Sequence, residues 1–300
     1  MKKTRFIWQN GKFIKWDLAK IHILSHALHY GSGVFEGIRA YETPRGPAVF
    51  RLSDHVDRLF RSAASLGMRV PYSKKTITSA IRKIVSINKL GNCYIRPIVF
   101  YETGQMALAP HGARVAVSIA AWPWGSYFGE HKALSVGVSR YIRFHPDSAM
   151  PGAKISGLYA TSVLAVLEAR KRGFDEAILL DHEGFVAEGP GENIFIVKRG
   201  KLFTPKSSSI LPGITRASIM AIAQGFGIPT AEKKITPEAF AAADEIFLTG
   251  TATEVAPVGK VNGRRIGTGG VGSITARLRA AYLDAARGNF PRYKRWLTSV

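Results

Sequence analysis

The sequence has almost no cysteine: Cys93 is the only one in 300 residues. An intrachain disulfide is therefore excluded, and the cysteine usage does not indicate a secreted, disulfide-stapled protein. Long apolar runs are absent as well, since no stretch approaches the roughly 18 residues that a membrane-spanning helix needs. Residues 1–13 start basic but contain no apolar core of signal-peptide length. We therefore expect a cytoplasmic protein with no membrane association.

Acidic residues are scarce: 21 Asp and Glu face 42 Lys and Arg, which gives a formal net charge of +21. Such a balance attracts anions, including phosphates, carboxylates and nucleic acid. The basic residues are dispersed, however, and the densest groups are Arg170-Lys171-Arg172 and Lys198-Arg199. No aromatic signature of an RNA-binding sheet is present. A solvated basic surface is the preferred interpretation, and a nucleic-acid-binding protein remains as an alternative.

Several catalytic signatures are missing. The chain has no phosphate-binding G-x-x-x-x-G-K-[ST] loop and no G-x-S-x-G of serine hydrolases. His26 and His29 have no nearby cysteine or H-E-x-x-H pattern, so we expect structural histidines and no metal. "GTGGVG", residues 267–272, matches G-x-G-x-x-G, but no strand–helix–strand unit follows, and Asp284 falls inside an expected helix. A nicotinamide-dependent dehydrogenase is therefore a weak alternative.

Strands and helices mix along the first half of the chain. Asn10-Gly11 between two short apolar runs predicts a hairpin. Apolar periodicity predicts helices over residues 54–68 and 73–91, the first opened by Ser53 and Asp54 and the second closed by Gly91. Alternating or continuous apolar runs predict strands over residues 32–42, 47–52, 93–102, 114–122 and 133–144.

The second half shows the same mixture. We expect a helix from the Lys154 region to about Arg172, and further helices over 213–227 and 273–288. Hairpins are expected over 176–189 and 193–205, and a strand, glycine turn and strand over 245–267. The Gly-, Pro- and aromatic-rich "PWGSYFGEHK" between the halves is typical of a connection. The fold class is thus α/β (mixed α+β), with a small N-terminal domain over 1–122, an interdomain loop over 123–132 and a large C-terminal domain over 133–300.

Lys154 lies in "AMPGAKISGLYATSVLAVLEA", residues 149–169, as the one lysine among small and apolar residues. It could be a snorkelling surface lysine, or an amine held in a pocket for covalent chemistry. "VAEGPGENIF" places Glu188 at the end of a strand before a glycine turn, where a carboxylate can face a cation. Alone, Glu188 reads as an ordinary turn residue.

Two further segments offer anion-binding groups. In "LPGITR", Gly213 is followed by Ile214 and Thr215 at a helix start, which presents N–H groups and a hydroxyl, although simple capping explains Thr215 equally well. "LTGTATE", residues 248–254, is a strand running into a threonine-rich glycine turn. A reactive lysine, a carboxylate and two phosphate cradles together are what pyridoxal 5′-phosphate (PLP) requires.

The chain resembles the branched-chain amino-acid aminotransferases, which are fold-type IV, PLP-dependent enzymes. The resemblance spans nearly the whole chain, and "EGPGEN" with "LPGITR" at this spacing is its most specific part. It also covers "HALHYGSGVFEGIRAY", "FRLSDHVDRLFRSA", "YIRP", "WPWGSYFG", "AKISGLYATS" and "GTATEV". "KISG" departs from the more usual "KAGG" or "KVGG" after the lysine. The family fold implies two α/β domains with the cofactor at their interface, in a homodimer or a higher assembly of dimers.

The resemblance also implies roles for individual residues. Lys154 would form the Schiff base with PLP, Glu188 would pair with the pyridine nitrogen, and Tyr159 would bond the ring hydroxyl oxygen. The phosphate would be bound by Arg58, Gly213, Ile214, Thr215 and Thr251, with Leu211 packed on the ring. The substrate would be bound by Tyr30, Phe35, Tyr94, Arg96, Trp124, Tyr127, Thr251 and Ala252.

The implied reaction moves an amino group between leucine, isoleucine or valine and 2-oxoglutarate in a PLP-dependent ping-pong cycle, so the partners are small amino and oxo acids. Other fold-type IV activities remain open: D-amino-acid aminotransferase, (R)-amine transaminase and aminodeoxychorismate lyase. The first-domain motifs favour the branched-chain reading. For Arg96, the plain alternative is a strand arginine paired with a surface acid.

Overall fold

The chain divides into two compact units. The computed structural model describes residues 2–125, 127–129, 133–148, 150–206 and 208–300. The first unit holds Met1–Gly125, Ala153–Leu158 and Ala285–Val300, and the second holds Ser126–Gly152 and Tyr159–Asp284. The first unit thus includes residues 153–158 and 285–300, which the sequence analysis placed in the C-terminal domain. Of the expected interdomain loop, residues 126 and 130–132 lie outside the described part.

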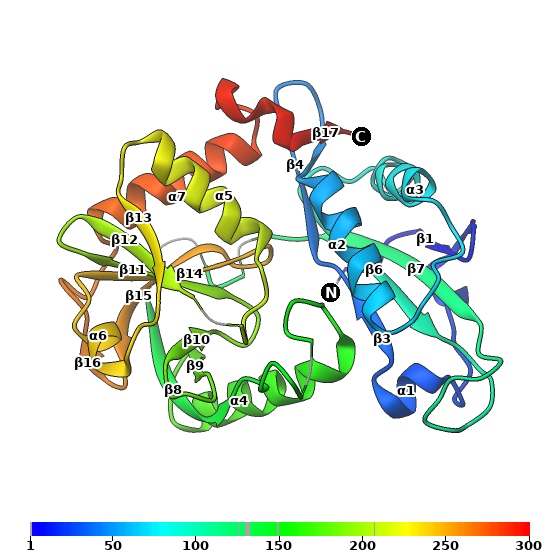
Figure 1. Ribbon diagram of the computed structural model, residues 1–300. Coiled ribbons are helices and arrows are strands. Elements are labelled where there is room, and N and C mark those ends of the chain that lie inside the picture. Colours follow the sequence, from blue (N-terminus) through cyan, green and yellow to red (C-terminus); the bar gives the residue numbers. More distant parts are fainter. Residues whose placement is uncertain (1, 126, 130–132, 149, 207) are drawn as a thin grey trace. The chain divides into compact units, whose positions relative to one another are not determined.

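The first unit is built on an eight-stranded antiparallel sheet in the order β17-β5-β4-β6-β7-β1-β2, with β3 also paired to β6 (Figure 1). Two helices, α2 (Leu52–Ser65) and α3 (Lys74–Ile87), pack against this sheet and share one hydrophobic core with it. The elements are β1 (Phe6–Gln9), β2 (Lys12–Lys15), η1 (Trp16–Leu18), α1 (His26–Tyr30), β3 (Gly33–Phe35), β4 (Ile38–Tyr41), β5 (Ala48–Phe50), α2 (Leu52–Ser65), α3 (Lys74–Ile87), β6 (Cys93–Tyr101), β7 (Val115–Pro123), η2 (Ser156–Leu158), η3 (Pro291–Trp296) and β17 (Leu297–Ser299).

The expected start of α2 was wrong. The helix begins at Leu52 because Arg51 adopts a left-handed conformation with φ of 51° and occupies the N-cap position. Asp54, expected to open the helix, instead lies in its first turn and pairs with the Arg51 guanidinium at 2.7 Å. The start of α3 follows the usual chemistry, since the Ser73 hydroxyl accepts the Thr76 N–H.

The single strand expected over 32–42 is interrupted at Glu36 and Gly37. Phe35 pairs with Ile98 and Ile38 with Ile95, so the register continues across the gap. Pro97 lies opposite Glu36 and has no N–H to donate, which interrupts the ladder there. The register puts Val34, Glu36 and Ile38 on the face that α2 and α3 cover, and Phe35 and Arg39 on the other face.

The second unit contains a nine-stranded mixed sheet in the order β10-β9-β8-β15-β14-β11-β12-β13, with β16 paired to β15. β8 runs parallel to β9 and β15, and β12 runs parallel to β13. The elements are β8 (Leu134–Ile142), α4 (Tyr159–Lys171), β9 (Glu176–Leu180), β10 (Val186–Glu188), β11 (Asn193–Lys198), β12 (Lys201–Pro205), α5 (Ile214–Gly225), β13 (Thr230–Lys233), α6 (Pro237–Ala241), β14 (Glu245–Gly250), β15 (Glu254–Val261), β16 (Arg264–Arg265) and α7 (Ser273–Ala286).

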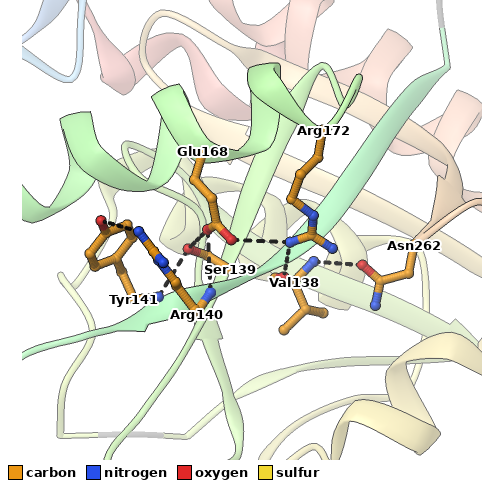
Figure 2. Close-up of polar contacts among 7 residues, drawn as sticks. All are labelled: Val138, Ser139, Arg140, Tyr141, Glu168, Arg172 and Asn262. Carbon is orange, nitrogen blue, oxygen red and sulfur yellow. Dashed lines mark hydrogen bonds and ion pairs between the residues drawn. The ribbon is translucent and has the colours of Figure 1, made fainter.

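Helix α4 is fastened to β8 by one carboxylate. Glu168 accepts the Ser139 hydroxyl at 2.5 Å and the Arg140 N–H at 3.3 Å, and pairs with Arg172 at 3.3 Å. Arg172 also donates to the Val138 carbonyl, so both Glu168 and Arg172 of α4 form hydrogen bonds with β8 (Figure 2). The sheet side of α4 carries small buried residues, among them Ser162 and Ala165, which allow the helix to approach closely.

Candidate active site

Lys154 is held by its backbone in the first unit. Its N–H donates to the Ser62 hydroxyl of α2 at 3.0 Å, and its carbonyl accepts the Phe35 N–H at 3.1 Å. Ile155 forms an antiparallel bridge with Val34, so this segment acts as a short extra strand beside β3. Ser62 and Ile155 are buried. The backbone of Lys154 is thus fixed by hydrogen bonds, while its side chain extends to the Phe35 ring on the sheet face away from α2.

One face of this sheet collects the amine, a guanidinium and several aromatic rings. The Lys154 Nζ lies 4.9 Å and the Arg96 Cζ 4.7 Å from the centre of the Phe35 ring. Arg96 also lies over the Tyr94 ring at 5.3 Å and donates to the Tyr94 hydroxyl at 3.2 Å. Trp122, opposite Tyr94 in the register, contacts that ring at a centroid distance of 5.3 Å. The face is therefore apolar in its walls and cationic at two points.

Trp124 joins the same face at the end of the first unit. Its ring lies 5.4 Å from that of Tyr94, and the buried Arg39 donates to the carbonyls of Trp124 at 3.5 Å and Gly125 at 3.1 Å. Gly37 faces the Tyr94 hydroxyl so closely that a Cβ there would overlap it. Glycine at 37 therefore makes room for the tyrosine.

Two glycines bring the lysine segment against α1. A Cβ on Gly31 would lie 2.6 Å from the Gly157 Cα, and the Gly157 N–H donates to the Gly31 carbonyl at 3.1 Å. Gly31 also has a φ of 63°, a conformation that favours glycine. Ile155, where the resemblance showed a departure, packs into the first unit's core and explains why a large apolar residue is accepted.

Arg58 belongs to a buried polar cluster that the sequence did not predict. Its Nε and Nη2 donate to the two carboxylate oxygens of Glu36 at 2.6 and 2.9 Å, and the His55 Nδ1–H donates to the same carboxylate at 2.7 Å. Burial alone would raise the pKa of Glu36, but Arg58 and His55 outweigh it and hold that pKa below its usual range. Burial lowers the pKa of His55, so the imidazole is neutral.

Glu188 ends β10 of the second unit, where its carboxylate is bound by neighbouring donors. Its carboxylate pairs with the Arg143 Nη2 at 2.8 Å and accepts the Asn193 Nδ2–H at 3.2 Å and the Leu211 N–H at 3.1 Å. The Glu188 side chain is only 5% exposed. An acidic side chain that is buried and already oriented by an arginine is placed as a partner of a cationic ring nitrogen would be.

The second glutamate of "EGPGEN" is used differently. Glu192 accepts the Gly191 N–H and the Thr253 hydroxyl, both at 3.0 Å, and so closes the turn on itself. Nearby, burial and then the charge of Glu192 raise the pKa of Glu176 to about 8. Glu176 is therefore protonated at neutral pH, and of these glutamates Glu188 has the setting of a cofactor partner.

The start of α5 has the features of an anion site. Gly213 is its N-cap residue with no side-chain cap, and Ile214 and Thr215 form its first turn. A Cβ on Gly213 would overlap the Asn193 amide oxygen, so only glycine fits beside the residue that holds Glu188. Thr251 and Ala252 form the turn between β14 and β15, preceded by Thr249, whose buried Oγ1 has no partner among the described residues. Helix N–H groups and threonine hydroxyls suit a phosphate.

A family model described as amino-transferase class IV matches residues 33–261. The chain belongs to the class IV aminotransferases. It is 47% identical over 297 residues to the branched-chain-amino-acid aminotransferase of Pseudomonas aeruginosa, covering 98% of this chain and 97% of that one. To the Escherichia coli (strain K12) protein of the same name it is 42% identical over 305 residues, with 100% and 98% covered.

Solved structures agree over the whole chain. A crystal structure of the Escherichia coli branched-chain amino acid aminotransferase superposes with a TM-score of 0.97 at 41% identity, covering 99% of each chain. The branched-chain amino acid aminotransferase of Thermobaculum terrenum, solved in its PLP form, superposes with a TM-score of 0.94 at 31% identity, again with 99% of each chain covered. The resemblance and the mixed α/β fold read from the sequence are thereby confirmed.

In this class IV aminotransferase, "GTGGVG" is not a dinucleotide site. The helix that follows, α7, is capped by the Glu245 carboxylate, which accepts the N–H groups of Ile274 at 3.1 Å and Thr275 at 2.7 Å. A Cβ on Gly272 would overlap Glu245, so the last glycine serves this internal cap. The dehydrogenase alternative loses its only support, and family membership disfavours the nucleic-acid alternative.

The predicted site residues of the aminotransferase divide between the two units. The first unit brings Lys154, Phe35, Tyr94, Arg96 and Trp124 to one face, with Arg58 held separately by Glu36. Tyr30 is exposed on α1 beside His26, and Tyr127 is exposed beside Phe128. Their parts in a pocket stay predictions. The second unit carries Tyr127, Tyr159, Glu188, Leu211, Gly213, Ile214, Thr215, Thr251 and Ala252.

The sequence reading missed the residues that hold the predicted ones: Glu36, His55, Ser62, Arg143 and Asn193. One signal was available, since the apolar face of α2 carries the polar residues His55, Arg58 and Ser62 at helical spacing. In the described part of the chain no helix is long and apolar enough to cross a membrane. The described residues also contain no cluster of three or more potential metal ligands.

Proposed function

We propose that the protein is a PLP-dependent transaminase that moves the amino group between leucine, isoleucine or valine and 2-oxoglutarate. The observation that carries this proposal is the single sheet face on which Lys154 and Arg96 both lie within 5 Å of the centre of the Phe35 ring. An amine, an apolar surface and a second cation are then available to one small substrate. The full-length similarity to branched-chain aminotransferases supports the same reaction.

The residues present fit PLP. Glu188 offers a buried anion for the pyridine nitrogen, and the uncapped start of α5, with Ile214 and Thr215, suits the phosphate. We assign Arg58 and Thr251 to the phosphate as well, Tyr159 to the ring hydroxyl oxygen and Leu211 to the ring face. When bound, PLP supplies an electron-poor ring that takes up the electrons left at Cα and an aldehyde carbon that carries the amino group.

Lys154 is assigned the proton transfer. Its amine would take the proton from the substrate Cα and return it at the cofactor's C4′, first as a general base and then as a general acid. Its backbone, fixed by Ser62 and Phe35, keeps the amine on the aromatic face during both steps. The carboxylate of Glu188 would keep the proton on the ring nitrogen.

Substrate selection follows from the same face. Phe35 and Trp124, with the rings of Tyr30 and Tyr127, would hold a branched aliphatic side chain, and Arg96 would bind the second carboxylate of glutamate or 2-oxoglutarate. The α-carboxylate common to all substrates is assigned to Tyr94 and to the N–H groups of Thr251 and Ala252.

The test of the reaction is glutamate formation from 2-oxoglutarate with a panel of amino donors. The proposal expects leucine, isoleucine and valine to react and D-alanine and (R)-1-phenylethylamine not to. Reaction of the D- or (R)-donors in place of the L-amino acids would indicate one of the other fold-type IV transaminases. Conversion of aminodeoxychorismate without an oxo-acid acceptor would indicate the lyase.

Two variants test the catalytic assignments. Lys154→Ala should still bind PLP and lose turnover, whereas Lys171→Ala, an exposed lysine at the end of α4, should behave as the parent. Glu188→Gln should keep the fold and lose most of the rate. A slow Glu192→Gln enzyme beside a normal Glu188→Gln enzyme would show that the wrong glutamate was assigned.

We further propose a homodimer, or a higher assembly of dimers. The outer side of α4 exposes Val163, Leu164 and Leu167 at 56%, 46% and 59%, a grouping typical of an interaction surface. Sedimentation of the purified protein tests this, and a monomer would contradict it. With one buried cysteine the chain suits a reducing compartment, and the cytoplasm is the location that we propose.

A further inference from the structure

The buried cluster of Glu36, His55 and Arg58 is more elaborate than packing requires. All three side chains are at least 94% buried, yet α2 already packs through Leu52, Val56 and Leu59. Burying an ion pair returns little net stability, because desolvation offsets the attraction. A structural role alone therefore explains the cluster poorly.

The geometry of the cluster fixes the arginine in one orientation. Glu36 is anchored to the central strand β6, since its N–H donates to the Pro97 carbonyl at 2.9 Å. Its carboxylate takes the Nε and Nη2 donors of Arg58 in a planar fork. His55, one helical turn before Arg58, donates to the Oε2 that Nη2 also uses. This fork fixes the plane of the guanidinium and turns its Nη1 away from the Glu36 carboxylate.

We propose that Glu36 is a positioning residue for the cofactor phosphate: it fixes the orientation in which the Arg58 guanidinium meets the phosphate, and His55 holds Glu36 in place. The inference rests on the proposed function, in which Arg58 binds the phosphate of PLP. The negative charge of Glu36 repels a phosphate, so Glu36 raises the affinity for the phosphate only if orienting Arg58 contributes more than this repulsion removes. Glu36 and His55 touch neither substrate nor cofactor.

The test compares PLP with pyridoxal, which lacks the phosphate, by absorbance titration of the full-length chain freed of cofactor by dialysis. Glu36→Gln keeps the size of the side chain and removes the charge and one acceptor. We expect it to weaken PLP binding about 10- to 100-fold, by analogy with the loss in metal affinity when a residue that orients a metal ligand is replaced. The affinity for pyridoxal should stay within about twofold of the parent's, about 0.4 kcal/mol, since pyridoxal has no phosphate for Arg58 to bind.

A matched control and a double variant complete the design. Glu102→Gln removes the carboxylate of another ion pair of the first unit, with Arg114, and should leave both affinities unchanged. Arg58→Met should lose PLP affinity selectively, and adding Glu36→Gln to it should cause no further loss, because the two act as one. If Glu36→Gln does not fold, His55→Gln carries the test, with a smaller loss in the same direction.

Three outcomes would overturn the inference. Equal losses for PLP and pyridoxal would mean a structural role, tighter PLP binding by Glu36→Gln would mean that only repulsion matters, and additive losses with Arg58→Met would mean independent action. If Arg58→Met itself kept the preference for PLP over pyridoxal, the assignment of Arg58 under the proposed function would fail. Leucine transamination by the parent enzyme tests the reaction separately.

Discussion

Replacing Arg96 by methionine should separate the two half-reactions of the proposed cycle. Arg96 lies over the rings of Phe35 and Tyr94, and its only hydrogen bond in the described part of the chain is to the Tyr94 hydroxyl. Its Nε is buried without a partner, and no described carboxylate pairs with it. The sequence-based alternative, a strand arginine paired with a surface acid, therefore does not describe this residue. Methionine keeps an unbranched apolar chain on Phe35 and removes the charge.

The expected size of the effect follows from this setting. A charge-assisted pair lost from a desolvated site costs about 2–5 kcal/mol, which at 1.4 kcal/mol per tenfold corresponds to a loss of roughly 30- to several-thousandfold. Glutamate and 2-oxoglutarate carry the second carboxylate and should lose this amount in kcat/KM. Leucine has an aliphatic side chain there and should change by no more than about threefold, about 0.7 kcal/mol, since methionine preserves the apolar contact.

The assay is steady-state kinetics with each substrate varied at a saturating level of its partner. Arg114→Met, an exposed arginine of the same unit paired with Glu102, is the matched control and should match the parent. Arg96→Lys should fall between, because it keeps a charge but not the planar fork. Equal losses for leucine and glutamate would refute the reasoning, since Arg96 would then act on the fold or on a shared group.

Three other predictions concern stability. Glu176 is protonated in the fold because its pKa there is about 8 against an ordinary value of 4.5, so the free energy of unfolding of the parent falls as the pH rises from 4.5 to 8. Glu176→Gln should remove this fall, up to roughly 5 kcal/mol, and identical Tm–pH curves for parent and variant would contradict the prediction. Gly31→Ala should lower the free energy of unfolding by about 1–3 kcal/mol through backbone strain, and further through the clash with Gly157, whereas Gly46→Ala, with a φ of 92° and open space around it, should show only the backbone strain. Equal urea midpoints for the two variants would contradict the close approach of Gly31 to Gly157. Glu245→Ala should lower the free energy of unfolding by about 1–2 kcal/mol through the lost α7 cap and leave KM values unchanged, and an altered KM would show that the cap affects the site.

Local chemistry made several elements predictable. The hairpin at Asn10-Gly11 joins β1 and β2, Ser73 caps α3, and the long apolar strands appear where alternation placed them. Lys154 and Glu188 could be proposed as site residues because their neighbouring motifs are specific. Such features depend on residues close together in the chain, which a single sequence displays directly.

Features that depend on distant partners were not predictable in the same way. The interruption of the strand at Glu36 depends on Pro97, and the contact of Lys154 with Ser62 joins residues 92 positions apart. Arg143 holds Glu188 from the end of β8, 45 positions earlier. The support of each predicted residue comes from tertiary packing, whereas the residue itself was visible in a motif.

The buried acidic side chains increase the positive charge of the surface, which affects the rate at which charged substrates encounter the protein. Among the described residues the buried acids are Glu36, Glu176, Asp181, Glu188 and Glu192, and the buried arginines are Arg39, Arg58 and Arg143. The exterior therefore has an excess of bases over acids greater than the two-to-one ratio of the composition. A dianion such as 2-oxoglutarate is drawn in by this field over about 10 Å at 0.1 M salt. Its encounter rate should accordingly fall as ionic strength rises, while that of zwitterionic leucine stays nearly constant.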